Sequence, residues 1–394
     1  MSTTHLPIIV VSDDFTGAAE IAGSGFSYGL ETQLLQKKIP NSLSDLTVVD
    51  SGIRSMDISG VLSTLESLID QLKTAPEHRL FLKIDSVMRG HVLQMVECFL
   101  ELDAYRSAVV LPGNPAIGRW INNGVFMINE APLHLTEFSH DPEYPVRDSS
   151  VQALLGDSEK YKIGLIEPGT RPRSGNICIG NLTSDADLNI HLKTTSEDSL
   201  IVGGAAAFEA MLRYRLPEIS VSKTDQSQSP SGNILLVLGS RSQEALYARW
   251  VLADHGTVIS YFPAELTLKN LSDPAYMDIW KDDVLKNLKM SSIAVIAVDG
   301  PTALEEGIPP KLTECMARVV TSVREQISIN ELIIEGGATA TEVLSCFHDE
   351  IYKPSHIPEP GVVQFSTENS GMNITTKVGS YEWPTGSILT YLNP

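Results

Sequence analysis

Two adjacent carboxylates, Asp13 and Asp14, follow an apolar run at residues 7–11 and open a helix-like segment. One aspartate at such a position is typical of a helix N-cap, which stabilises a helix by about 1 kcal/mol. Capping uses one aspartate and leaves the other unexplained. The second carboxylate could bind sugar hydroxyls, hold Mg²⁺ or accept a hydroxyl proton, and we favour a functional role for the pair.

Two arginines follow other apolar runs. Arg54 comes after residues 46–49 and a turn that contains glycine. A lone arginine is more often a solvated surface charge, but Arg54 would also form a bidentate clamp for an anionic substrate. Arg119 closes the proline- and glycine-rich turn after residues 108–111, where simple turn formation and a site-lining role are about equally expected. Arg119 is therefore the residue of this turn to test.

The strongest pattern of the first half is Lys83 and Asp85 at the end of an apolar run, with Ser86 and Arg89 in the turn beyond it. Strand alternation places Lys83 and Asp85 on the same side of the expected strand. The alternative is a structural ion-pair network. Because burying such a network costs desolvation and rarely adds much stability, we favour a binding role.

Small polar residues follow an apolar run at residues 234–238 in the second half. They are Gly239, Ser240 and Ser242, and a helical pattern at 243–252 comes next. A helix start of this kind presents backbone N–H groups that can bind an anion. A serine N-cap alone would give the same residues, so the pattern is weak by itself.

A more specific glycine pattern follows residues 332–334. Gly336 and Gly337 would let the backbone approach a phosphate closely, and Thr339 could both cap the next helix and donate a hydrogen bond. The alternative is a tight strand-to-helix turn. A further glycine-containing stretch, residues 371–379, could close over a nucleotide.

Short apolar runs that alternate with helix-like segments predict an α/β fold with open, mostly parallel sheets. The clearest runs are residues 7–11, 46–49, 80–84, 108–111, 234–238, 293–298 and 332–334. Ligands of such sheets collect at the carboxyl ends of the strands. The motifs above follow predicted strands, so their side chains are expected at these edges.

A polar segment divides the chain. Residues 222–233 read SKTDQSQSPSGN and contain no apolar residue, which makes them the best linker candidate. The length of 394 residues also exceeds what one hydrophobic core usually supports. The sequence therefore predicts a first domain at residues 1–221, a linker at 222–233 and a second domain at 234–394.

Composition restricts the partners of the protein. The formal charge is −20, from 49 acidic and 29 basic residues, which opposes binding to nucleic acid or to an anionic membrane surface. A small anionic ligand would need a local cluster of lysine and arginine. The four cysteines lack C-x-x-C spacing, which argues against a zinc site and a disulfide framework. Without a basic leader or an apolar stretch of about 18 residues, we expect a cytoplasmic protein.

Motifs of several other enzyme classes are missing. The sequence has no G-x-x-x-x-G-K-[ST] motif, and the G-S-G at residues 23–25 lies inside a helix-like segment instead of after a strand. Neither a nucleophile elbow nor an H-E-x-x-H motif is present. A P-loop enzyme, a dinucleotide-dependent enzyme, a serine hydrolase and a zinc protease are therefore disfavoured.

Taken together, these residues resemble the four-carbon acid sugar kinase family, whose members phosphorylate threonate, erythronate, 3-oxo-tetronate and similar acids. The matching pieces occur in the family's order along nearly the whole chain. They are residues 13–18, Arg54, and residues 83–90, 115–119, 201–204, 239–240, 336–340 and 377–380.

The resemblance implies that a first domain binds the sugar acid and a second domain binds ATP, each built on a mostly parallel sheet flanked by helices, with a cleft between them. Substrate contacts would come from residues of the first half, namely Asp13, Asp14, Arg54, Lys83, Asp85, Ser86, Arg89 and, from its own turn, Arg119. Nucleotide contacts would come from residues of the second half, namely Gly239, Ser240, Ser242, Gly336, Gly337, Ala338, Thr339 and Gly379.

A mechanism follows as a hypothesis, because phosphoryl transfer depends mainly on alignment and charge neutralisation. Arg54, with Lys83 or Arg89, would hold the substrate carboxylate. Asp14 or Asp85 would orient and deprotonate the accepting hydroxyl. Mg²⁺ and backbone amides of residues 336–339 would neutralise the triphosphate of ATP.

Two departures from the family pattern keep other functions open. Ala338 stands where the family's G-G-E-T loop has an acidic residue, and residues 378–383 read VGSYEW where a glycine-rich K-S-G-G-F-G is usual. These features favour a non-catalytic protein that binds or senses a sugar acid. A nucleotide-dependent enzyme of another class, such as a dehydrogenase, is a further alternative, and a homo-oligomeric assembly also stays open.

Overall fold

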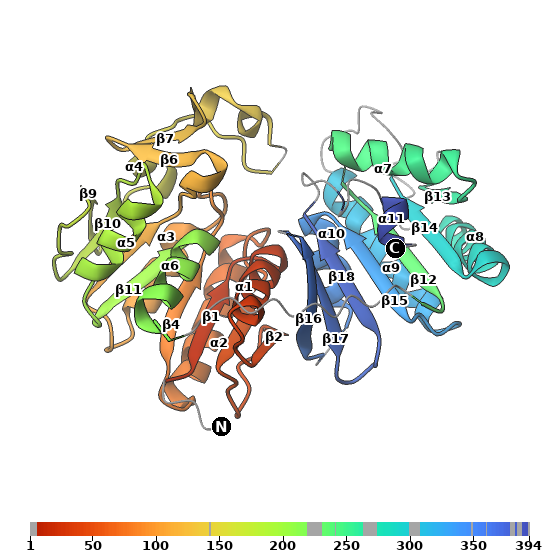
Figure 1. Ribbon diagram of the computed structural model, residues 1–394, viewed down its shortest axis with the longest axis horizontal. Helices are drawn as coiled ribbons and strands as arrows, with labels where there is room; N and C mark the ends of the chain where they lie inside the picture. Colours follow the sequence, from red (N-terminus) through yellow and green to blue (C-terminus); the bar gives the residue numbers. More distant parts are fainter. Residues whose placement is uncertain are drawn as a thin grey trace. The chain divides into compact units, whose positions relative to one another are not determined.

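The computed structural model describes residues 6–141, 143–218, 231–240, 242–262, 274–298, 308–347, 350–359, 361–378, 383 and 388–392. The chain divides into two compact units, Met1–Ser222 and Lys223–Pro394. Each unit has its own sheet and its own helices (Figure 1). The four cysteines are free thiols. In the described part of the chain, no helix is long and apolar enough to cross a membrane.

The first unit is built on a sheet in which every pair of neighbouring strands is parallel. The strands, in spatial order, are β2 (Thr32–Gln36), β3 (Leu46–Asp50), β1 (Ile8–Ser12), β4 (Arg79–Lys83), β11 (Ser199–Gly203), β5 (Ser107–Leu111), β10 (Asn176–Gly180) and β9 (Lys162–Ile166). The central strands are apolar on both faces and fully buried, as expected of a sheet covered on both sides.

Helices cover both faces of this sheet (Figure 1). They are α1 (Phe15–Ser27), α2 (Ile58–Thr74), α3 (Val92–Leu100), α4 (Val151–Leu155), α5 (Asp185–Thr194) and α6 (Ala205–Arg215). Helices α2 and α3 pack on the face that carries Val11 and Leu82. Helices α1 and α6 pack against each other on the opposite face, where Phe81 meets the edge of Phe208.

A small antiparallel sheet is inserted after β5. Its strands are β6 (Arg119–Asn122), β7 (Val125–Ile128) and β8 (Ala131–Pro132). The 3₁₀ turn η1 (Pro115–Ile117) precedes it, and the turns η2 (Leu133–Leu135) and η3 (Glu137–His140) follow it. This insertion places Arg119 and the aromatic side chain of Phe138 near the end of strand β4.

The second unit has a mixed sheet. The strands, in spatial order, are β13 (Ile259–Tyr261), β14 (Ile293–Ala297), β12 (Ile234–Leu238), β15 (Glu331–Glu335), β18 (Asn373–Lys377), β17 (Val362–Thr367) and β16 (Tyr352–Glu359). The first five are parallel, and β17 runs antiparallel to both of its neighbours. The described helices are α7 (Gln243–Asp254), α8 (Pro274–Ser291), α9 (Ile308–Arg324), α10 (Gly337–Ser345) and α11 (Ile388–Leu392).

The predicted α/β class with mostly parallel sheets is confirmed. Each of the seven predicted strands is present, with ends that differ by at most two residues. Within the stretch 371–379, Asn373–Lys377 form the buried strand β18 between β15 and β17, and Gly379 lies outside the described residues, so closure of this stretch over a nucleotide stays a prediction. Most of the predicted linker, residues 222–230, lies outside the described residues.

Candidate functional site

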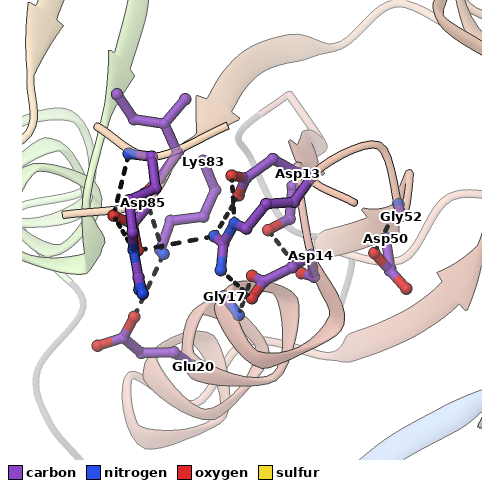
Figure 2. A network of polar contacts seen from close by, with 12 residues as sticks. Asp13, Asp14, Gly17, Glu20, Asp50, Gly52, Lys83 and Asp85 are labelled. Atoms are coloured by element: carbon purple, nitrogen blue, oxygen red, sulfur yellow. Dashed lines mark hydrogen bonds and ion pairs between the residues drawn. The ribbon is translucent and has the colours of Figure 1, made fainter. Parts of the chain in front are cut away.

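The polar residues of the first unit converge because three strands end in register. Ser12, the last residue of β1, pairs with Asp50 of β3 on one side and Lys83 of β4 on the other. The segments that follow these strands are also hydrogen-bonded to one another, because the Asp13 N–H donates to the Lys83 carbonyl (3.2 Å). The Arg54 N–H donates to the Asp13 carbonyl (3.1 Å). Figure 2 shows the resulting network at this edge of the sheet.

Asp14 caps helix α1, and Asp13 does not. The Asp14 Oδ1 atom accepts from the Gly17 N–H at 2.8 Å, which confirms that one aspartate of the pair is an N-cap. Gly17 is required by close packing, because a Cβ atom there would lie 2.8 Å from both Asp14 Oδ1 and Lys83 Nζ and 2.9 Å from Ser12 Oγ. The first turn of α1 therefore packs directly against the polar cluster.

Arg54 is a buried partner of both aspartates instead of a solvated surface charge. Its Nε and Nη2 atoms donate to the two Asp13 carboxylate oxygens, each at 2.9 Å, and Nη1 donates to Asp14 Oδ2. The Arg54 side chain is 16% exposed. Burial raises the pKa of Asp13 although Arg54 opposes this change. Burial alone would lower the pKa of Arg54, but Asp13 and Asp14 outweigh it and raise that pKa.

Lys83 brings an ammonium group into the same cluster. It is 4% exposed, and its Nζ donates to the Ile84 carbonyl at 3.2 Å. Glu20 Oε2, on helix α1, lies 3.4 Å from Nζ (Figure 2). The sequence did not single out Glu20. The only indication of its role is that this carboxylate follows the acidic pair by almost two turns of the same predicted helix. A buried lysine with one half-exposed counter-ion keeps donor capacity for a ligand.

Asp85 and Arg89 form a saturated pair. Asp85 accepts from Arg89 Nε (3.1 Å), from Arg89 Nη2 (2.8 Å), and from the backbone N–H groups of Val87 (3.1 Å) and Arg89 (3.2 Å). Burial alone would raise the pKa of Asp85, but Arg89 and Arg54 outweigh it and lower that pKa strongly. Arg89 Nη1 also donates to Asp141 Oδ2 at 2.7 Å, and no sequence pattern indicated this partner.

Arg119 reaches the same region from the inserted sheet. Its guanidinium donates to Ser86 Oγ. The Phe138 ring lies between two arginines, with its centroid 5.4 Å from Cζ of Arg89 and 5.8 Å from Cζ of Arg119. The Tyr144 hydroxyl donates to the Arg54 carbonyl. The eight residues predicted to bind substrate therefore lie in one region of the first unit.

Asp50 is a further buried carboxyl beside the cluster, and sequence reasoning missed it (Figure 2). It is 1% exposed and accepts from the Gly52 N–H (2.9 Å) and Gln36 Nε2 (3.4 Å). Burial, with a smaller contribution from Asp14, raises the pKa of Asp50 to about 7. The only sequence signal is an aspartate that ends an apolar run.

In the second unit, two glycine turns at the ends of β12 and β15 touch. A Cβ atom on Gly239 would overlap the side chain of Thr339, and one on Gly336 would lie 3.3 Å from the Ser240 N–H nitrogen. Gly336 has φ +104°, in the region that favours glycine. Ser242 caps α7 by accepting from the Ala245 N–H at 3.2 Å, as predicted for a serine at this helix start.

The predicted capping role of Thr339 was wrong. Gly336 is the N-cap residue of α10 and supplies no side chain, whereas Thr339 is buried against Gly239. Gly337 and Ala338 form the first turn of α10, and Ala338 is exposed. Gly379 lies outside the described residues.

A buried ion pair supports the second glycine turn and was not predicted. Lys377 Nζ lies 3.2 Å from Glu335 Oε2, and both side chains are fully buried. Burial raises the pKa of Glu335 and lowers that of Lys377. The Gly336 N–H donates to the Lys377 carbonyl at 3.0 Å, so β18 holds the start of the turn. The sequence signal for this ion pair was a charged residue at the end of each of the strands β15 and β18, as Lys83 ends strand β4.

The two glycine turns pack against each other at two neighbouring helix starts. Backbone N–H groups at helix starts are of the kind that can bind a phosphate. No group of three or more His, Cys, Asp or Glu side chains in the described ranges is arranged to hold a metal ion. Mg²⁺ that accompanies a nucleotide commonly takes most of its ligands from phosphates and water.

Comparisons with known proteins agree with this arrangement. The model of the sugar-binding N-terminal domain family matches residues 8–212. A D-threonate kinase from Salmonella typhimurium is 22% identical over 95% of each chain. A 3-oxo-tetronate kinase from Brucella melitensis is 24% identical over 70% of this chain and 68% of its own length.

A solved structure shows the same fold. A Salmonella typhimurium LT2 protein with the provisional description tRNA synthase superposes with a TM-score of 0.77 and 17% identity over 99% of both chains. That identity supports the fold and not the activity. Because the family model covers 205 of the 394 residues and the relatives above are a threonate kinase and a tetronate kinase, the chain belongs to the four-carbon acid sugar kinase family.

Proposed function

We propose that the protein transfers the γ-phosphoryl group of ATP to a hydroxyl of a four-carbon sugar acid. The kinase names of its relatives support the reaction class. The observation that carries the proposal is the buried cluster of Asp13, Asp14 and Lys83 where strands β1 and β4 end, because it combines hydroxyl acceptors and a cation at the ligand-binding edge of a parallel sheet.

In this proposal the first unit binds the sugar acid. Its contacts come from residues at or after the ends of β1, β3 and β4 and from the start of β6, namely Asp13, Asp14, Arg54, Lys83, Asp85, Ser86, Arg89 and Arg119. A polyol acid needs several acceptors and donors at fixed spacing, and the short hydrogen bonds among these residues hold their side chains in place before a ligand arrives.

Asp14 is the proposed acceptor of the hydroxyl proton. Its two oxygens each accept one hydrogen bond, from the Gly17 N–H and from Arg54, so lone pairs are available for a substrate hydroxyl. Asp85 is a weaker base, because four N–H donors surround it and its pKa is lowered. Lys83 would neutralise negative charge that develops on the transferring phosphoryl group.

The bond changes balance in a single displacement. The substrate oxygen forms a bond to the γ-phosphorus, the bond between that phosphorus and the β,γ-bridging oxygen breaks, and the hydroxyl proton passes to Asp14. When bound, ATP supplies the phosphoryl group and Mg²⁺ neutralises the triphosphate. The products are ADP and a phosphate monoester of the sugar acid.

The second unit is the proposed nucleotide site. Its contacts come from the two touching glycine turns and the helix starts behind them, namely Gly239, Ser240, Ser242, Gly336, Gly337, Ala338 and Thr339, with Gly379 from outside the described residues. Their backbone N–H groups would bind phosphates, and the absence of side chains at the glycines would allow close approach. Transfer requires the two sites to meet during catalysis.

The test is a screen for ATP consumption with D-threonate, D-erythronate and 3-oxo-tetronate. We expect turnover with at least one acid, and a loss of at least about 100-fold in kcat for Asp14→Asn. Asp85→Asn should lower kcat/KM through substrate positioning. The exposed Asp103→Asn is the matched control and should behave as wild type. Wild-type rates in both site variants would overturn the assignment.

One observation favours a second function. Ala338 is exposed in the first turn of α10, where the family pattern has an acidic side chain. A protein that had lost nucleotide use would keep the sugar-acid site and act as a sensor. Calorimetric titration with ATP and Mg²⁺ separates the two functions, since a kinase must bind the nucleotide and a sensor of this kind would not.

A further inference from the structure

The two arginines nearest the end of β4 are already neutralised by protein carboxylates. Arg54 uses Nε and Nη2 on Asp13 and Nη1 on Asp14. Its guanidinium therefore uses three of its five N–H donors on two carboxylates. A substrate carboxylate could take the bidentate Nε and Nη2 face of Arg54 only by displacing Asp13.

Arg89 is occupied in the same way. Its Nε and Nη2 donate to Asp85, and its Nη1 donates to Asp141 at 2.7 Å. The two arginines are surrounded by the carboxylates of Asp13, Asp14, Asp85 and Asp141, so the group as a whole is negative. This group repels a further anion, which makes it a poor place for the acid end of a substrate.

Arg119 differs from both. Its guanidinium donates to the Ser86 hydroxyl and lies over the Phe138 ring, and within the described residues it makes no ion pair. The remaining donors of Arg119 are available to a ligand. A guanidinium beside a hydroxyl is a suitable receptor for a carboxylate, because both groups can donate to its oxygens.

Asp13 and Asp14 suit the other end of the ligand. Each of their carboxylates is fixed by Arg54, and each oxygen keeps a lone pair for a hydroxyl. Arg54, which holds Asp13 and Asp14, also lies 3.9 Å from Asp85, the residue before Ser86, so the Arg119 receptor and the aspartate pair both lie beside the turn after β4. A short acid with hydroxyls on its remaining carbons needs this combination of an anion receptor and hydroxyl acceptors.

We propose that Arg119 and the Ser86 hydroxyl bind the carboxylate of the sugar acid, that Asp13 and Asp14 accept hydrogen bonds from its hydroxyls, and that Arg54 is a positioning residue that holds the two aspartates. This assignment rests on the proposed sugar-acid substrate. It replaces Arg54 as the carboxylate clamp that the sequence alone suggested.

The test compares an acid with its uncharged analogue. Calorimetry of the full chain measures binding of D-threonate and of D-threonamide, which has the same hydroxyls without the negative charge. Wild type should prefer the acid by about 10- to 100-fold, the range expected of hydrogen bonds to a charged group. Arg119→Met should weaken acid binding by that factor, change amide binding less than about 3-fold, and so remove the preference.

Further variants separate binding from folding. Ser86→Ala should reduce the preference in the same direction by a smaller factor, and Arg119→Lys should keep part of it. Arg54→Lys should weaken both ligands in parallel, because it disturbs the hydroxyl acceptors. The control Arg106→Met removes a largely exposed arginine of the same unit and should leave both affinities unchanged.

The outcomes are distinct. A preference for the acid that survives in Arg119→Met, or a parallel loss of both ligands in that variant, would overturn the assignment. So would an Arg54→Lys protein that loses only the preference. Wild type that binds neither ligand would overturn it together with the substrate class. Binding of the acid without ATP consumption would overturn the proposed catalysis alone. The carboxylate assignment would then still be decided by whether Arg119→Met prefers D-threonate over D-threonamide.

Discussion

Replacement of Asp50 by asparagine should stabilise the protein above neutral pH and leave it nearly unchanged near pH 4. Burial raises the pKa of Asp50 from 3.8 to about 7 in the folded protein. Between these two values the folded state keeps a proton that the unfolded state releases. Stability from this carboxyl is therefore complete below about pH 4 and is lost as pH rises through about 7.

The magnitude follows from the two pKa values. Each pH unit over which only the folded state holds the proton changes the free energy of unfolding by about 1.4 kcal/mol, so the full loss is about 4 kcal/mol. Asparagine stays neutral at all pH values, and its side-chain oxygen can still accept from the Gly52 N–H. The advantage of Asp50→Asn over wild type should therefore grow from near zero at pH 4 to about 4 kcal/mol at pH 8.

Urea unfolding of both proteins at each pH between 4 and 8, followed by circular dichroism, measures this difference. Titratable groups that both proteins share contribute equally to the pH dependence of the free energy of unfolding, so their contributions cancel in the difference. The exposed Asp103→Asn is the control and should track wild type. A difference between Asp50→Asn and wild type that stays constant from pH 4 to pH 8 would refute the reasoning, because it would mean that Asp50 releases its proton equally in both states.

Three further substitutions probe the two sites. Gly17→Ala places a methyl group against the ammonium of Lys83 and should lower kcat/KM for the sugar acid by at least about 10-fold in steady-state kinetics. An unchanged kcat/KM would show that the cluster tolerates displacement. Gly239→Ala overlaps Thr339 and should weaken ATP binding in calorimetry without changing acid binding; equal loss of both ligands would contradict separate sites. Lys377→Met leaves its buried glutamate partner unpaired and should destabilise the protein by about 3–5 kcal/mol in urea unfolding, and a loss under 1 kcal/mol would contradict the pair's importance.

Seven strands of the two sheets could be predicted because a parallel strand covered on both faces is a continuous apolar run. Other strands, among them β2, β9, β10 and β11, were not predicted. The polar residues after these runs could be predicted as a site for the same reason, since parallel strands bring their carboxyl ends to one edge. Strand β18 was missed because Thr and Lys dominate its sequence and glycines stand on both sides of it, although it is buried between two other strands.

Pairing within the site could not be predicted. Residue types identify Arg54 as a suitable carboxylate clamp, but only the fold shows that Asp13 and Asp14 already occupy it. Arg89 and Asp141 are 52 residues apart, and no local pattern connects them. The raised pKa of Asp50 depends on burial and on Asp14 at the start of helix α1, and neither is visible in the residues beside it.

The central claim is that Asp14 accepts the proton of a sugar-acid hydroxyl while that hydroxyl takes a phosphoryl group from ATP. Phosphorus NMR of reactions that contain ATP, Mg²⁺ and D-threonate or 3-oxo-tetronate tests it most directly. The account predicts one new phosphate monoester signal for each ADP formed by wild type, and almost none in the Asp14→Asn reaction. ADP formed with free phosphate as its only partner, or an equal monoester signal from the variant, would contradict it.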